Sequence, residues 1–265
     1  MKQVQDLLGL FGHFLNFGNL RMTNLTRFFA ALGLVSLVGG AQATLSDRGG
    51  GMIYDSDLDI TWLQNWNQGA GSGYDDTVGL VGTGRMTWDN ARAWADTLVW
   101  GGYSDWRLPN IVETGGIGCD YSNAGGTDCG YNVLTQMTKS GSTMYNEMAH
   151  LWHETLGNLA YCAVGDEACD SPQPGWGLKN RGPFTNMQPY GYWSGTVEDG
   201  DLRSPSAWLF WIDDGYQNNP QKSNALFAVA VRAGDVTSAV PEPQVYSMLL
   251  VGLGALSIAL RRRPD

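Results

Sequence analysis

Short stretches of alternating hydrophobic and polar residues dominate the middle of the chain. Residues 52–55 and 58–63 are rich in β-branched and aromatic side chains, and the turn-forming pair Ser56-Asp57 separates them. This alternation predicts two short strands joined by a tight turn. Three later stretches have the same character, namely 192–194, 207–212 and 225–232.

Two other stretches have the period of a helix. Residues 88–99 follow Thr87, a good N-cap, and Asp89 lies in the first turn, near the positive end of the helix dipole. The hydrophobic face of this helix comprises Trp88, Ala91, Ala95 and Leu98. A second helix is predicted over 144–159, with an inward face of Met148, Leu151, Trp152, Thr155 and Leu159. Strands, two helices, a loop-rich section and further strands together predict an α+β domain.

The C-terminal segment differs because residues 246–260 are apolar on every side, unlike an amphipathic core helix. As a helix this segment would be about 22 Å long, somewhat short of a ~30 Å hydrocarbon core. Three arginines follow it, and the positive-inside rule retains them in the cytoplasm. They are Arg261, Arg262 and Arg263. The preceding triplet Pro241-Glu242-Pro243 cannot continue a helix, so it marks an extended and accessible site.

This arrangement resembles the PEP-CTERM sorting signal of exported proteins from Gram-negative bacteria that make exopolysaccharide. The resemblance implies that residues 240–265 are a sorting signal, anchored transiently in the inner membrane through 246–260. It also implies that an exosortase-type protease cuts near Pro241, Glu242 and Pro243. The processed protein is then expected in the cell envelope, on the outer surface or in the extracellular matrix.

The N-terminal segment has the pattern of a signal peptide. Arg27 precedes an apolar run over residues 28–40, and Ala41-Gln42-Ala43 forms an A-x-A cleavage site. Residues 1–43 are therefore expected to be removed, which leaves a mature domain over 44–239. A signal peptide of ordinary length would begin at Met22, and we expect that residue to be the true start.

The mature part of the chain is strongly acidic. Between residues 44 and 243 there are 10 Lys and Arg against 24 Asp and Glu, so the formal charge is −14. Such a surface repels phosphate backbones, and we expect no nucleic-acid partner. All 11 tryptophans lie between Trp62 and Trp211, and glycine is abundant. This composition favours a compact, loop-rich extracellular fold over a disordered chain or a helical bundle.

The four cysteines form two local pairs, Cys119 with Cys129 and Cys162 with Cys169. An even number in an exported chain indicates disulfides, and four cysteines allow three connectivities. The short spacing favours 119–129 together with 162–169. The competing interpretation, a zinc site, is disfavoured because the chain lacks paired C-x2-4-C knuckles.

Metal-binding patterns are weak. His150 and His153 could share one face of a helix, but the sequence around them matches neither H-E-x-x-H nor H-x-x-E-H. Asp55, Asp57 and Asp59 imitate the start of an EF-hand loop. The loop then lacks its glycine and its bidentate glutamate, so turn chemistry explains these three aspartates better. We expect neither a metal nor a cofactor.

Catalytic patterns are equally sparse. The sequence contains no G-x-S-x-G, P-loop or Rossmann glycine pattern. Four carboxylates could in principle supply the acid and the base of a hydrolase. They are Asp199, Asp201, Asp213 and Asp214. Solvated acidic residues explain them more simply, and we expect no catalytic residues.

The string Asp105-Trp106-Arg107-Leu108-Pro109-Asn110 is the most specific of several motifs spread over residues 52–235. Together they resemble the Lcl C-terminal domain family, a family related to a collagen-like adhesin. The other motifs are Asp59-Ile60-Thr61-Trp62, Thr87-Trp88, Glu147-Met148-Ala149-His150-Leu151, Gly182-Pro183-Phe184-Thr185-Asn186, Tyr192-Trp193-Ser194-Gly195-Thr196 and the strand that ends at Arg232. The resemblance implies a C-type-lectin-like or formylglycine-generating-enzyme-like fold, in which two helices flank a small twisted antiparallel sheet. The oxidase chemistry of the second group is not implied, because it needs a late cysteine pair.

We expect the family motif to serve the structure. A tryptophan fills core volume, an Asp–Arg pair joins neighbouring elements, and Pro-Asn forms a turn. The residues concerned are Asp105, Trp106, Arg107, Leu108, Pro109, Trp193 and Arg232. The alternative makes Trp106 a platform on which a sugar ring stacks. Trp208 and Trp211 have opposite parity on one strand, and the outward-facing one is the better sugar contact.

The sequence thus predicts an exported, non-catalytic surface or matrix protein with a lectin-like domain. Its expected partners are the processing exosortase and an exopolysaccharide or another surface polymer. An envelope hydrolase with an Asp/Glu site and a purely structural surface protein are the alternatives.

Overall fold

The computed structural model describes residues 45–75, 79–114, 118–198 and 203–236. The predicted signal peptide, the triplet Pro241-Glu242-Pro243 and the apolar segment 246–260 lie outside these residues. Within the described ranges, every helix is too short or too polar to cross a membrane.

A four-stranded antiparallel sheet joins the two ends of the domain. Its strands in spatial order are β1 (Leu45–Asp47), β2 (Met52–Asp55), β3 (Ile60–Leu63) and β11 (Val231–Ala233). The predicted hairpin of β2 and β3 is confirmed, with Ile53 opposite Trp62. Val231 of β11 pairs with Trp62 from the other side, so the last strand closes the sheet that the first strands open.

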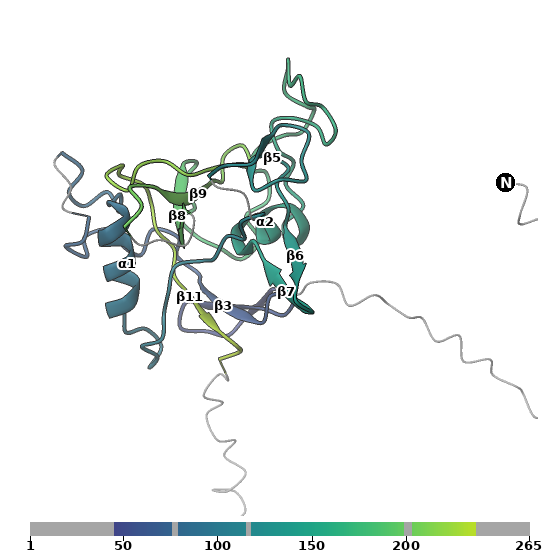
Figure 1. Ribbon diagram of the computed structural model, residues 1–265. Helices are drawn as coiled ribbons and strands as arrows, with labels where there is room; N and C mark the ends of the chain where they lie inside the picture. The colour runs from purple at the N-terminus through teal and green to yellow at the C-terminus, as the bar shows by residue number, and fades with distance from the viewer. Residues whose placement is uncertain (1–44, 76–78, 115–117, 199–202, 237–265) are drawn as a thin grey trace, which may run out of the picture. The chain divides into compact units, whose positions relative to one another are not determined.

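A second sheet has five strands, and β8 and β9 run side by side in it (Figure 1). Its spatial order is β4 (Tyr121–Ser122), β5 (Cys129–Tyr131), β10 (Tyr216–Asn218), β9 (Ala207–Trp211) and β8 (Gly191–Val197). Strands β4 and β5 are parallel, and the other neighbours are antiparallel. A separate hairpin consists of β6 (Gln136–Lys139) and β7 (Ser142–Tyr145).

The first predicted helix is confirmed as α1 (Trp88–Thr97), with Thr87 as its N-cap. The Thr87 side chain accepts a hydrogen bond from the Asn90 N–H. The helix ends slightly before the predicted residue 99 because Leu98 is already extended. Its buried face includes Trp94, which the sequence pattern did not single out, beside Trp88, Ala91 and Ala95.

The second predicted helix, 144–159, is much shorter in the structure. Residues 142–145 form β7, and α2 (Glu147–His150) continues into a π-helical turn, η1 (Leu151–Thr155). Gly157 follows with φ +66°, which is the left-handed region that ends a helix. Leu159 therefore lies outside the helix and is 45% exposed, so its predicted inward position was wrong.

The predicted strand over 225–232 is also shorter, because its residues pair with different partners. Leu226 bridges Met86, and Phe227 bridges Tyr192. Single bridges to two partners do not make a continuous ladder. Only from Val231 onward does the segment pair regularly, with β3.

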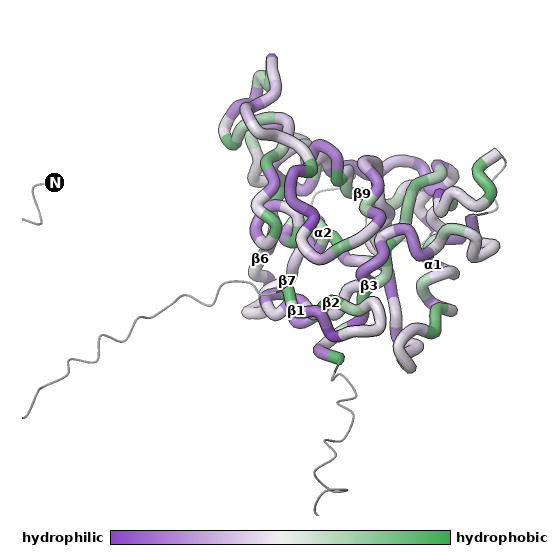
Figure 2. The backbone as a smooth tube through the Cα atoms, turned by 180° about the vertical axis from the view of Figure 1, so that it is seen from behind, coloured by the Kyte–Doolittle hydropathy of each residue, from purple (hydrophilic) through white to green (hydrophobic). Residues whose placement is uncertain are grey.

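Tryptophans are the largest side chains of the core. Eight of the eleven are at most 3% exposed, namely Trp62, Trp66, Trp88, Trp94, Trp106, Trp152, Trp193 and Trp208. Several buried indoles donate to backbone carbonyls of other elements, as Trp88 does to Ser194 and Trp193 to Met86. Hydrophobic and hydrophilic segments alternate at short intervals along the chain (Figure 2). The prediction of a small, loop-rich α+β domain is confirmed.

Candidate functional site

Two arginine–carboxylate pairs hold the family-specific string in place. Arg232 of β11 donates two hydrogen bonds to Asp105, at 2.9 and 3.0 Å. Arg107 donates two to Glu147 at the start of α2, at 2.8 and 2.7 Å. Both are forked contacts, in which a planar guanidinium matches a carboxylate. The hydrogen bonds from Arg232 lower the pKa of the Asp105 carboxyl, so the charge of this group is stabilised within the chain.

Trp106, Leu108 and Pro109 of the string are packed inside the domain, whereas Asn110 is exposed. Trp106 and Leu108 are at most 3% exposed, and the Trp106 indole donates to the Trp100 carbonyl. The Pro109 carbonyl accepts a hydrogen bond from the Gly195 N–H at 2.8 Å. Because Trp106 is buried, it does not offer a surface on which a sugar could stack.

The two histidines of the mature chain do not share a site. The Nε2 atom of His150 lies 3.2 Å from Oδ2 of Asp57. His153 packs edge-on against Trp152, and burial lowers its pKa to about 4. Across the residues that the structure describes, no group of three or more His, Cys, Asp or Glu is arranged to hold a metal ion.

The three aspartates between β2 and β3 shape a turn. Asp55 accepts hydrogen bonds from the N–H groups of Asp57 and Leu58, at 3.1 and 3.4 Å. Asp59 has a positive φ of 50° and accepts the hydroxyl of Tyr54. These contacts are the turn chemistry that the sequence favoured over a calcium loop.

Three tryptophans keep part of their ring at the surface, namely Trp100, Trp176 and Trp211. Trp211 ends β9, and its strand neighbour Trp208 is fully buried. As expected from their opposite parity, the two side chains lie on opposite sides of the strand, and Trp211 is the one that faces outward. This makes the surroundings of Trp211 the first place to look for a ligand.

The turn after Trp211 puts two carboxylates next to its ring. Trp211 pairs directly with Tyr216 across the β9–β10 hairpin, and the turn between them carries Asp213 and Asp214. Gly215 makes this turn possible: its φ is +78°, and its N–H donates to the Trp211 carbonyl at 2.9 Å. A Cβ atom at Gly215 would meet the Trp152 ring at 2.7 Å, so only glycine fits.

Contacts between rings continue from this hairpin to β5 and then to two residues outside the strands. Tyr216 lies 5.0 Å from Tyr131, measured between ring centroids. Tyr131 stacks on Tyr161 at 5.9 Å, and Tyr161 meets Trp176 edge-on at 4.9 Å. We call these four residues the aromatic band.

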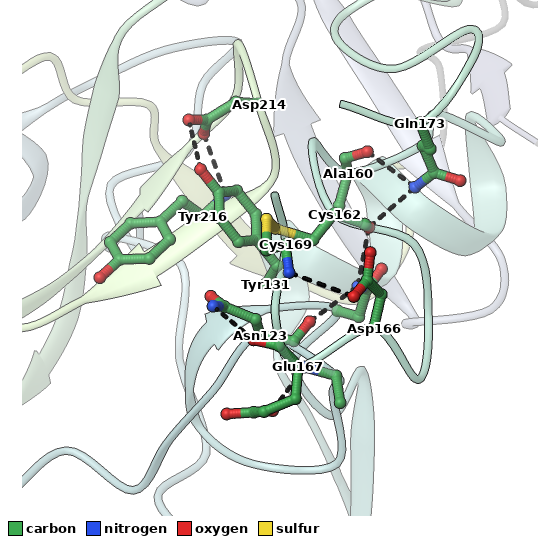
Figure 3. The surroundings of a disulfide bond; sticks show 12 residues. Asn123, Tyr131, Ala160, Cys162, Asp166, Glu167, Cys169, Gln173, Asp214 and Tyr216 are labelled. Atoms are coloured by element: carbon green, nitrogen blue, oxygen red, sulfur yellow. Dashed lines mark hydrogen bonds between the residues drawn. A yellow bond between two sulfur atoms is a disulfide. The ribbon is translucent and has the colours of Figure 1, made fainter. Parts of the chain in front are cut away.

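The structure joins Cys119 to Cys129 and Cys162 to Cys169, the pairing that the spacing favoured. The Cys162–Cys169 disulfide lies close to Tyr131 and Asp214 (Figure 3). The Cys162 carbonyl accepts hydrogen bonds from the side chains of Asn132 and Gln173, at 3.0 and 2.8 Å. The disulfide loop thereby supports β5, the strand that carries Tyr131.

Two pockets flank Trp211. The acidic pocket has a volume of about 380 Å³ and is lined by Tyr131, Trp211, Asp213, Asp214, Tyr216 and Asn218. The arginine pocket has a volume of about 370 Å³, and Arg85, Tyr190, Trp211, Asn218 and Asn224 are among its lining residues. Because Trp211 and Asn218 line both, one ligand could occupy the two pockets together.

The arginine pocket contains a fixed cation. Arg85 donates from Nε to the Ala225 carbonyl at 2.9 Å and from Nη2 to the Tyr190 hydroxyl at 3.0 Å. Its guanidinium lies 4.4 Å from the centroid of the Tyr190 ring. Tyr190 in turn meets Trp211 edge-on at 4.7 Å, so a chain of contacts fixes the indole from this side.

The acidic pocket has the opposite charge. Burial, and secondly the charge of Asp213, raise the pKa of Asp214 to about 6. Burial also raises the pKa of Asp213. The partners of the Asp214 side chain are the Tyr216 N–H at 3.1 Å and the Tyr131 hydroxyl at 3.3 Å (Figure 3). Neither carboxylate forms an ion pair with a described residue, so their charges are not balanced within the described part of the domain.

The sequence predicted parts of this site but not the whole. It predicted that one of Trp208 and Trp211 faces outward, without saying which, and it offered Asp213 and Asp214 among four spare carboxylates. Asp199 and Asp201, the other two, lie outside the described residues. Tyr131 and Arg85 were missed, because only the pairing of distant strands and loops brings them to Trp211. The spacing of Trp211 and Tyr216 about a glycine-containing turn was the one local signal available.

A model of the Lcl C-terminal domain matches residues 51–232, and the chain belongs to this family. A model of the PEP-CTERM protein-sorting motif matches residues 239–263. This motif marks an exported protein of the Gram-negative cell envelope, whose membrane-anchored precursor is processed by an exosortase. No curated protein and no solved structure was found to match the chain.

Proposed function

We propose that this protein is a non-catalytic, exosortase-sorted surface or matrix protein that holds an exopolysaccharide or a similar polymer at Trp211. One observation carries the proposal: the partly exposed indole of Trp211 lines two pockets that also contain charged and polar side chains, while the tryptophans of the core are buried. Sugar rings have apolar faces that stack on indoles and hydroxyl groups that need nearby hydrogen-bond partners. The setting around Trp211 supplies both.

The size of the site suits an extended ligand better than a small metabolite. The two pockets meet at Trp211, and the aromatic band leads away from the acidic pocket toward Trp176. A polymer could contact several rings in succession, and repeated weak contacts add up to useful avidity. Such a role fits a protein that its sorting motif delivers to the cell envelope.

The arrangement of the strands is compatible with a lectin-like fold. The last strand, β11, pairs with β3 of the first hairpin, and the five-stranded sheet and the helices come between them in the chain. We propose that the family has a lectin-like fold, and that this fold explains why loops surround Trp211. It is separate from the ligand proposal, which rests on the pockets.

Replacing Trp211 tests the proposal directly. Trp211→Ala should weaken binding of the host's purified exopolysaccharide about 5- to 30-fold, because one stacked ring contributes on the order of 1–2 kcal/mol. Trp100→Ala is the matched control, since Trp100 is also partly exposed but packs on Gly51, away from the site. Binding would be measured by co-sedimentation of the full chain with the polymer.

Equal binding by the wild type and by Trp211→Ala would exclude the site. Equal loss in Trp211→Ala and Trp100→Ala would attribute the effect to stability. A Trp211-dependent loss with Trp100→Ala unaffected would support the proposal.

One observation favours hydrolysis as a second candidate function. The pKa of Asp214 is raised to about 6 beside a second carboxylate, a condition under which a general acid operates near neutral pH. Incubation of the polymer with the protein, followed by an assay of new reducing ends, separates the two functions. Release that is lost in Asp214→Asn would support a hydrolase, whereas binding without release supports the non-catalytic role.

A further inference from the structure

The acidic pocket differs from the arginine pocket in the kind of chemical group that it suits. Three aromatic rings and two carboxylates line it, and its lining contains no basic residue. The rings belong to Tyr131, Trp211 and Tyr216, and the carboxylates to Asp213 and Asp214. The face of an aromatic ring is the negative part of its quadrupole. Rings and carboxylates therefore both favour a positive charge in this pocket.

Two oxygen atoms of residues that line the pocket lack donors, and one of them belongs to the Asp213 carboxylate. Oδ1 of Asp213 and Oδ1 of Asn218 are shielded from water and have no hydrogen-bond partner among the described residues. An acceptor that is shielded from water and has no donor raises the free energy of the folded domain. Its negative potential acts across the pocket with little screening, because the surroundings are partly apolar.

An ammonium group meets all of these conditions. It carries a positive charge for the carboxylates and the ring faces, and it brings three N–H donors and no acceptor. A carboxylate or a sulfate would be repelled by Asp213 and Asp214. An uncharged hydroxyl would leave the charges of both aspartates unbalanced.

We propose that the acidic pocket binds the free amine of an amino sugar, so that the preferred polymer contains deacetylated hexosamine units. The inference rests on the proposed function and specifies its ligand. The sugar ring stacks on Trp211, its ammonium group lies on the side of Asp213 and Asp214, and the next unit enters the arginine pocket. A lysine side chain has an ammonium group but no ring, and it would leave Trp211 and the second pocket without a partner.

Two oligosaccharides that differ only in acetylation provide the test. The full chain, purified in a neutral detergent, is titrated calorimetrically with the β-1,4-linked glucosamine hexamer and with its fully N-acetylated counterpart. The free-amine hexamer should bind at least about tenfold more tightly, as expected for a desolvated cation between rings and carboxylates. In the double variant Asp213→Asn, Asp214→Asn this preference should disappear, so that the ratio of the two affinities falls to about one.

Arg85→Gln is the matched control, because it changes a charge in the neighbouring pocket and should keep the preference for the amine. Equal affinity for the two hexamers, with both lost in Trp211→Ala, would overturn this inference and leave the proposed function standing. Failure of the wild type to bind either hexamer or the host polymer would contradict both. Binding of tetralysine through Asp213 and Asp214, without binding of the free-amine hexamer, would replace the amino sugar by a peptide and overturn the inference.

Discussion

In the region of the family motif each carboxylate faces an arginine, whereas on the β9–β10 hairpin two carboxylates face aromatic rings and backbone N–H groups. Asp105 is paired with Arg232, and Glu147 with Arg107. The pKa of Asp105 is lowered by its partner, while burial raises the pKa of Asp214 to about 6. The same residue type is thus stabilised as an anion in one region and destabilised in the other.

The tryptophans differ between the two regions in the same way. Trp106, in the motif, is buried, and its indole N–H bonds to a carbonyl. Trp211, at the hairpin, is partly exposed between two pockets. Matched groups support a fold, and unmatched groups at a surface indicate a site that is completed by a ligand. The comparison predicts that replacing a carboxylate lowers stability in the motif region and raises it on the hairpin.

The largest change in the free energy of unfolding is expected from Glu147→Ala. The Glu147 side chain is 8% exposed, and it accepts two hydrogen bonds from Arg107 and one from the Asn110 N–H at 2.7 Å. Removing it leaves a partly buried guanidinium and an N–H group without their acceptor, which should lower the free energy of unfolding by about 3 kcal/mol. Urea denaturation of the wild type and the variant measures this difference.

The control for Glu147→Ala is Asp105→Ala. The Asp105 side chain is 56% exposed, so the Arg232 pair should contribute only about 0.5–1 kcal/mol. Equal losses for the two variants would mean that burial does not distinguish the two pairs. The comparison between matched and unmatched carboxylates would then need another explanation.

The two arginine–carboxylate pairs also show what could and could not be predicted from the sequence. The Asp105–Asn110 string was recognised as structural because tryptophan, proline and paired charges have clear local roles. The partners Glu147 and Arg232 lie 40 and 127 residues away from Arg107 and Asp105, respectively. Periodicity describes local structure, so it cannot assign partners at such separations.

The predicted boundaries of the second helix were wrong for a related reason. The apolar stretch after Met144 was assigned to one long helix, but residues 142–145 pair with β6 and leave the helix to begin at Glu147. The hydrophobic pattern alone does not separate a strand from the first turn of a helix. The opposite orientation of Trp208 and Trp211, by contrast, was predictable, because side chains on a strand alternate strictly between its two sides.

A medium effect is expected from Gly215→Ala in the hairpin that carries Asp213 and Asp214. The new Cβ atom would have to adopt a φ of +78° and would meet the Trp152 ring. The expected loss is about 2–3 kcal/mol in the free energy of unfolding. Gly234→Ala is the control, since its φ is +72° and no atom lies within 4 Å of the added Cβ.

The difference between Gly215→Ala and Gly234→Ala measures the contact with Trp152 separately from the backbone strain. Gly234→Ala should cost only about 1 kcal/mol. If both variants lose the same amount, then Trp152 does not restrict the hairpin, and the position of the acidic pocket is less fixed than the structure indicates.

The smallest change in stability is expected from Asp214→Asn, and it has the opposite sign. Asp214→Asn should stabilise the domain at pH 7.5, because it removes a charge that burial and Asp213 disfavour. The folded pKa, about 6, lies above the ordinary value of 3.8, so the folded state holds the proton more tightly than the unfolded state. Wild-type stability attributable to this group is therefore greatest below pH 4 and is lost as the pH rises through 6. A two-unit shift corresponds to roughly 3 kcal/mol, which partial exposure reduces to about 1–2 kcal/mol.

Melting temperatures of the wild type and Asp214→Asn, measured from pH 4 to pH 8, test this sign. The variant should melt a few degrees higher at pH 7.5, and its advantage should vanish toward pH 4. Asp105→Asn should do the reverse and melt lower at pH 7.5, because the pKa of Asp105 is depressed by Arg232. Destabilisation by both substitutions at pH 7.5 would mean that the hairpin carboxylates are as well matched as those of the motif. A gain for Asp214→Asn together with weaker ligand binding would show that the domain keeps this carboxylate for its ligand at the expense of stability.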